Sequence, residues 1–170
     1  MNKVIGTIIF AAICFSFKAS AQTFDVPKDY HFDQQTNYAL YEPDIVKAAD
    51  WLQKTRWGTE PKKTEAVTQF VLKWAQGVPY IVIELKQAVM DVSDANPQLG
   101  FIYMAQYCKY AIQHPKNFEA NKASIDALRA VVAKYQAEPT HKHDSQVERL
   151  IDLEKANELE SWVNNDFTFY

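Results

Sequence analysis

Apolar residues recur with the period of an α-helix along most of this chain, and this recurrence constrains the fold more than any other feature. Four apolar residues between Ile45 and Leu52 are spaced i, i+3, i+4, i+7, and four between Val67 and Trp74 repeat the same spacing. Such spacing gathers the apolar side chains on one face of a helix, where they can pack against other helices. The sequence therefore predicts an all-α fold.

Proline and glycine residues indicate where these helices begin and end, because Pro is favoured in the first turn of a helix and Gly just after the last. The sequence predicts about six helices, at 43–57, 60–77, 81–92, 96–114, 119–135 and 144–163. The connections between them are short, so consecutive helices should be antiparallel. A closed bundle and a short array of helical hairpins both satisfy this pattern.

Tyr80–Leu85 is a segment in which strand and helix compete. Its sequence, YIVIEL, is rich in the β-branched residues that favour strands. Over a longer window, the apolar residues between Ile81 and Val92 keep a helical period. Because the longer window outweighs local propensity, we predict a helix.

Residues 1–21 have the three-part layout of a secretory signal peptide. Lys3 is followed by an uncharged apolar run, and Ala19-Ser20-Ala21 supplies the small residues of a cleavage site before Gln22. The apolar run, 4–17, is shorter than the roughly 20 residues of a membrane-spanning helix. The sequence predicts a cleaved signal peptide and a mature protein in the periplasm or outside the cell, without a membrane span.

The rest of the chain is expected to have three parts. Residues 22–42 lack a helical period and carry five aromatic residues, so we expect an extended arm that lies across the domain. Residues 43–165 form a single helical domain, and 166–170 a short C-terminal tail. A chain of this size can bury a core of its own.

Charge and glycine content exclude several classes of function. Loss of Lys3 and Lys18 with the signal peptide would change the formal net charge from −3 to −5, which argues against nucleic acid as a partner. Only four glycines are present and none are clustered, which argues against phosphate-binding loops and dinucleotide folds. Cys14 also lies in the signal, so Cys108 remains alone; we interpret it as a buried thiol, with an intermolecular disulfide as the alternative.

Tyr103, Tyr107, Tyr110 and His114 share one face of the predicted helix at 96–114, because they are spaced i, i+4, i+7, i+11. A row of phenol rings offers stacking surface with hydroxyl groups at its edge, which suits a partner helix, a peptide or a sugar. The alternative is a helix contact inside the protein. We treat this face as a candidate binding surface.

His141, His143 and Asp144 are candidate metal ligands, because a His-x-His pair beside a carboxylate could bind Zn²⁺ or Cu²⁺. The alternative is a solvated loop in which Asp144 caps the following helix. Carboxylate pairs at Glu148/Asp152 and Glu154/Glu158 are each one helical turn apart, and we interpret them as solvated helix faces.

We expect a non-enzymatic binding or interaction module whose partner is another protein or a cell-envelope ligand. No catalytic residue and no cofactor is predicted. The alternatives are a small metal-dependent or carboxylate hydrolase, and a carrier that holds an apolar ligand between its helices. Bound metal would favour the first alternative, and a cavity between the helices the second.

Three segments carry a resemblance to known proteins: Ala48–Pro79, Asn96–Ile112 and Ala120–Val132. Together they resemble small secreted bacterial proteins of similar length that have no established function. The resemblance implies a signal peptide and an all-helical domain. It implies no active-site residues.

Overall fold

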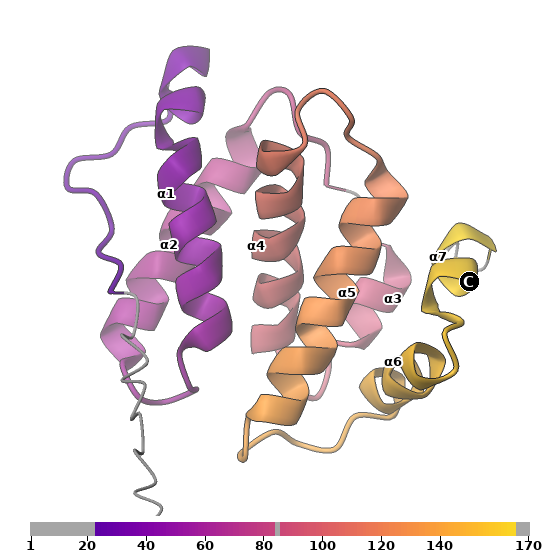
Figure 1. Cartoon of the computed structure of the whole chain (residues 1–170). Helices are drawn as coiled ribbons and strands as arrows, with labels where there is room; N and C mark the ends of the chain where they lie inside the picture. The colour runs from indigo at the N-terminus through magenta and orange to yellow at the C-terminus, as the bar shows by residue number, and fades with distance from the viewer. Residues whose placement is uncertain (1–22, 84–85, 166–170) are drawn as a thin grey trace, which may run out of the picture.

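The computed structural model describes residues 23–83 and 86–165, and these residues contain seven helices and no strand (Figure 1). The all-α prediction is confirmed. The predicted signal peptide and the C-terminal tail at 166–170 lie outside the described residues. The helices are α1 (Gln35–Lys54), α2 (Pro61–Gly77), α3 (Gln87–Asp91), α4 (Gln98–Gln113), α5 (Ala120–Ala137), α6 (Ser145–Lys155) and α7 (Leu159–Asn165).

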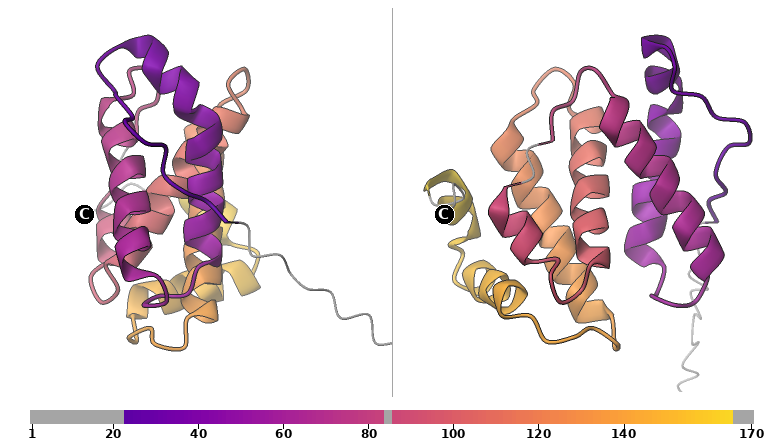
Figure 2. Two further views of the ribbon diagram at one scale, coloured as in Figure 1. Left: turned by 90° about the vertical axis from the view of Figure 1, so that its left-hand side faces the viewer. Right: turned by 180° about the vertical axis from the view of Figure 1, so that it is seen from behind.

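Helix α4 lies in the middle of the bundle. It contacts α1, α2, α3 and α5, and nine of its sixteen residues are buried. Helices α1, α4 and α5 lie side by side in one layer, with α2 and α3 behind them (Figures 1 and 2). Helices α6 and α7 pack against the outer side of α5. A helix that is apolar on several sides takes such a central position because other helices cover each side. None of the helices in the described part of the chain is both long and apolar enough to span a bilayer.

The first helix begins eight residues before the predicted start at Pro43, so Gln35–Glu42 is helical rather than part of an arm. A proline inside a helix removes one backbone hydrogen bond. Tertiary contacts hold the turns that precede Pro43: the Trp74 indole donates to the backbone oxygen of Tyr38 (2.9 Å), and the Tyr80 hydroxyl donates to Glu42 (2.7 Å).

Residues 23–34 precede α1 and run along α1 and α2 without helix or strand (Figure 2, left). Their aromatic rings gather around Phe70 of α2, which is fully buried. The Phe70 ring centroid lies 4.9 Å from that of Tyr30, 5.8 Å from that of Phe32 and 6.3 Å from that of Phe24. Aromatic packing therefore attaches this segment to the bundle.

The predicted helix at 81–92 is wrong over its first part, because residues 81–83 and 86 are not helical and, among the described residues of this range, only Gln87–Asp91 forms a helix. Val82 is 74% exposed while its two neighbours are half-buried, which is the alternation of an extended chain. The backbone oxygen of Val82 accepts a hydrogen bond from the Tyr107 hydroxyl (3.2 Å). This tertiary bond and the low helix propensity of β-branched residues together favour the extended form.

The predicted helix at 144–163 is divided into α6 and α7. Asn157 adopts the left-handed conformation, with φ 57°. The Glu158 N–H donates to the oxygen of Leu153 (2.8 Å), and the Asn157 N–H donates to that of Glu154 (3.1 Å). These two bonds form a Schellman motif, which ends a helix. Asn tolerates this conformation better than most residues, so the sequence carried a weak signal for the break.

Candidate functional site

Tyr103 and Tyr107 do not form an exposed binding surface. They are 0% and 1% exposed, because α5 and the extended segment around Val82 cover them. The Tyr103 hydroxyl donates to the Ser124 hydroxyl on α5 (3.1 Å), and that of Tyr107 donates to the Val82 oxygen. The predicted tyrosine surface is wrong at these two positions, and both rings belong to the core.

Tyr110 and His114 occupy the accessible end of the same helix face. Tyr110 is half-buried and His114 exposed, and their rings stack at 4.0 Å. The His114 Nδ1 lies 2.8 Å from the Tyr110 backbone oxygen, which can only accept a hydrogen bond. Of the predicted surface, this pair alone stays open to solvent.

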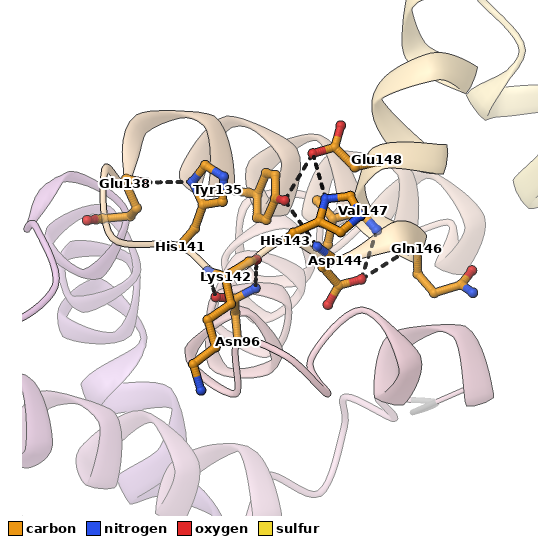
Figure 3. Close-up of polar contacts among 10 residues, drawn as sticks. All are labelled: Asn96, Tyr135, Glu138, His141, Lys142, His143, Asp144, Gln146, Val147 and Glu148. Carbon is orange, nitrogen blue, oxygen red and sulfur yellow. Dashed lines mark hydrogen bonds and ion pairs between the residues drawn. The ribbon is translucent and has the colours of Figure 1, made fainter.

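The candidate metal ligands His141, His143 and Asp144 bind different partners (Figure 3). His141 Nδ1 lies 2.6 Å from the backbone oxygen of Glu138, and its ring packs against Tyr135 with centroids 3.9 Å apart. The His143 side chain is 80% exposed. Within residues 23–83 and 86–165, no group of three His, Cys, Asp or Glu side chains is placed to hold a metal ion.

Asp144 instead caps helix α6. Its Oδ1 accepts hydrogen bonds from the backbone N–H groups of Gln146 (3.0 Å) and Val147 (3.2 Å). These N–H groups have no partner inside the helix, so the carboxylate stabilises its first turn. The alternative interpretation of this motif, as a capping loop, is the one that the geometry supports.

Two buried polar side chains attach the loop between α5 and α6 to the bundle (Figure 3). Asn96 exchanges two hydrogen bonds of 2.8 Å with the backbone of Lys142. The Tyr135 hydroxyl donates to Glu148 (3.0 Å) and accepts from the Asp144 N–H (3.2 Å). Burial and the bond to Glu148 raise the pKa of Tyr135. The network has a structural role, because each of its bonds orients the loop.

The carboxylate pairs do not enclose a substrate. In the pair Glu154/Glu158, Glu154 binds Arg129 at 2.9 Å on the surface. Glu158 borders an open hollow beside His143, as do Glu148 and Asp152 of the other pair. Hydrolases that use two carboxylates hold them across a cleft, with one in an apolar setting. This geometry is absent from both pairs.

A groove with a different character opens where the loop between α1 and α2 meets the start of α4. We call it the Trp57 groove. Its volume is about 360 Å³, and a narrower recess of about 50 Å³ extends from it toward Leu52 and Ile102. The volume lies near the lower end of the range for small-molecule sites, roughly 300–1,000 Å³. The open part is lined by Trp57, Gly58, Pro61, Thr64, Glu65, Thr68, Gln69, Gln98 and Phe101.

The two aromatic side chains of the Trp57 groove remain accessible. Trp57 is half-buried, and Phe101 is 39% exposed although most of α4 is buried. The helical period of apolar residues does not show whether either side chain is buried in the core or accessible to solvent. An accessible pair of rings in a concave site can contact the apolar face of a ligand.

A buried ion pair holds Trp57 in place. Lys134 on α5 and Glu138, which directly follows that helix, are each 2% exposed, and the Lys134 Nζ lies 2.5 Å from the Glu138 carboxylate. The same Nζ donates to the backbone oxygen of Thr55 (2.5 Å). The backbone N–H of Trp57 donates to both carboxylate oxygens of Glu138 (3.1 and 3.2 Å). The ammonium group also lies 6.0 Å from the centre of the Trp57 ring. The pair thus fixes the loop that carries one wall of the groove.

The rim of the groove offers polar groups that the protein does not use. Thr64 and Thr68 are one turn apart on α2, and Gln98 lies one turn before Phe101 on α4. Within the described residues, the side chains of Thr64, Thr68, Gln69 and Gln98 make no hydrogen bond to another protein group. They are therefore available to a ligand. Among the described residues that line the groove and its recess, one charged group of each sign is present, Arg56 and Glu65, and their charges cancel.

Sequence reasoning missed this site because its parts are far apart in the chain. A Lys and a Glu four residues apart on a helix normally form a solvent-exposed pair. Here the Thr55–Trp57 loop binds both Lys134 and Glu138, which are buried. Trp57 beside Gly58 was the one local signal, since an indole in a turn is seldom needed for the turn itself. Comparison with protein-family models, curated proteins and solved structures finds no match for this chain.

Proposed function

We propose that this is a non-enzymatic binding protein of the cell envelope or the exterior, and that its ligand lies in the Trp57 groove. The secretory signal predicted at residues 1–21 supports the location. The groove supports binding, because it combines accessible aromatic rings with polar groups that lack protein partners. Neither the candidate metal ligands nor the carboxylate pairs offer comparable support for an enzyme.

The observation that carries the proposal is the buried Lys134–Glu138 pair beneath Trp57. A buried ion pair is seldom more stabilising than apolar residues of the same size. Its hydrogen bonds to the loop backbone, however, hold the aromatic wall in one position before any ligand arrives. A preformed site loses less conformational entropy on binding, so it binds more tightly.

Tryptophan fluorescence tests the proposal directly. Of the four tryptophans, Trp51, Trp74 and Trp162 are at most 7% exposed, so a soluble quencher acts mainly on the half-buried Trp57. Low-molecular-mass and protein fractions of the host envelope should each be tested for protection of this fluorescence from acrylamide. One fraction should protect, and protection should disappear in Trp57→Ala because the reporting ring is removed.

Two further variants separate binding from loss of the reporter. Phe101→Ala keeps Trp57 but removes the other aromatic ring that lines the groove, so it should also lose protection. Leu40→Ala removes a side chain that is 69% exposed on another part of the molecule, and it should respond like the unmodified protein. Full protection in Phe101→Ala would place the ligand elsewhere and contradict the proposal.

A further inference from the structure

We infer that the Trp57 groove binds a neutral saccharide unit, a sugar ring stacked on Trp57 whose hydroxyl groups bind the rim. This inference rests on the proposed function and names the ligand class of the same site. It follows from three properties of the groove: the chemistry of its lining, its charge and its size.

The lining matches the two faces of a sugar ring. The C–H groups of a pyranose form an apolar patch that packs against an aromatic face, while its hydroxyl groups project around the ring edge. In the groove, Trp57 and Phe101 supply the aromatic faces. Thr68 and Gln98 supply rim groups that can both donate and accept hydrogen bonds, as a sugar hydroxyl requires.

The charge of the groove favours a neutral ligand. Phosphate and carboxylate sites gather Arg or Lys side chains, because the anion needs several charge-assisted bonds. Here Arg56 is offset by Glu65. The nearby Lys63 is already paired with Asp25 at 3.0 Å. An anionic or cationic ligand would therefore find one attractive and one repulsive group.

The size and shape argue against the other neutral candidates. The apolar recess of about 50 Å³ is too small for a lipid chain. A peptide that binds by strand addition would need a strand edge to pair with, and residues 23–83 and 86–165 contain no strand. A volume of about 360 Å³ suits one or two sugar rings.

Titration with neutral sugars tests the inference. We would measure acrylamide quenching of the purified protein with glucose, N-acetylglucosamine, maltotriose, cellotriose and chitotriose. At least one should protect Trp57. A trisaccharide that binds more tightly than its monosaccharide indicates a glycan chain as the source, and equal affinities indicate a free sugar; either supports the inference.

The rim variants give the sharpest comparison. Thr68→Val keeps the shape of the side chain and removes its hydroxyl, and Gln98→Leu does the same for the amide. Each should weaken sugar binding by about threefold to tenfold, the effect of one lost hydrogen bond. Leu40→Ala, a change at an exposed side chain away from the groove, should leave the affinity unchanged. Unchanged affinity in both rim variants would overturn the inference.

The aromatic dye 1-anilinonaphthalene-8-sulfonate, whose rings bind accessible apolar surface, distinguishes failure of the saccharide inference from failure of the proposed function. If no sugar protects Trp57 but the dye binds the unmodified protein and not Phe101→Ala, the saccharide inference fails and the groove remains a binding site. If neither sugars, dye nor envelope fractions reach Trp57, the proposed function fails as well.

Discussion

Replacing Glu138 by Gln should destabilise the protein far more than a surface charge substitution does. The change leaves the Lys134 ammonium, 2% exposed, without an anionic partner. Removing one partner of a buried ion pair costs about 3–5 kcal/mol. The amide oxygen of the introduced side chain would still accept a hydrogen bond from the backbone N–H of Trp57. We therefore expect a loss of free energy of unfolding near the lower limit, about 3 kcal/mol. This is a large part of the roughly 5–15 kcal/mol that stabilises a domain.

Urea unfolding followed by circular dichroism measures this effect. With a slope of about 1–3 kcal/mol/M, the midpoint should fall by about 1–3 M while the slope stays constant. Glu154→Gln is the matched control, because Glu154 forms an ion pair with Arg129 in which the side chains are 38% and 43% exposed. Such an exposed pair contributes about 0–1 kcal/mol. Equal losses in the two variants would refute the reasoning.

The double variant Lys134→Met, Glu138→Gln tests whether the unpaired charge is the cause. It removes both charges, so it should be more stable than Glu138→Gln alone despite the additional substitution. Its Trp57 should be more open to acrylamide than in the unmodified protein, because the loop loses the Lys134 bond to Thr55. If the losses of free energy of unfolding in Lys134→Met and in Glu138→Gln simply add in the double variant, the two charges are not coupled.

Three further predictions concern the bundle itself. Gly77→Ala should destabilise by about 1–3 kcal/mol in thermal unfolding, because a Cβ there would overlap the Tyr38 hydroxyl, which is itself bonded to the backbone of Phe32; an unchanged melting temperature would show that the ring moves freely. Asp144→Ala should lose about 1 kcal/mol with the cap of α6, and Asp144→Asn should retain most of it. Burial raises the pKa of the Cys108 thiol to about 12, so the native protein should resist iodoacetamide until it is unfolded. The thiol ionises at lower pH in the unfolded protein than in the native one, so its ionisation destabilises the fold. The free energy of unfolding should therefore be unaffected by this group below about pH 8.5 and should decline as the pH rises toward 12. Cys108→Ser should show a shallower decline.

Much of the helix pattern could be predicted from local signals. Helices α2, α4 and α5 lie close to the expected ranges, because Pro61, Gly77 and Pro97 mark their ends and the apolar period marks their faces. The errors lie where a tertiary contact competes with local preference. Residues 35–42 are helical because Tyr38 packs on α2, and the chain around Val82 is extended because Tyr107 binds its carbonyl oxygen.

The candidate sites were harder to predict, since exposure is not a local property. Four aromatic residues on one helix face look the same in sequence whether solvent or another helix covers them. Tyr103 is buried because Ser124 of α5 lies against it, whereas Phe101 stays accessible because it faces the groove. A period of 3.6 residues specifies which side chains share a face but not what that face meets.

By itself, the sequence determined the all-α class and most helix positions, because apolar spacing, prolines and glycines act over a few residues. Only the tertiary structure decided which faces are core, that Asp144 is a cap, and that Lys134 and Glu138 are buried beneath Trp57. These outcomes depend on packing between segments up to about eighty residues apart, such as Trp57 and Glu138. Burial turns a Lys and a Glu four residues apart into a support for the groove, since a charge removed from water is costly unless it is paired and hydrogen-bonded.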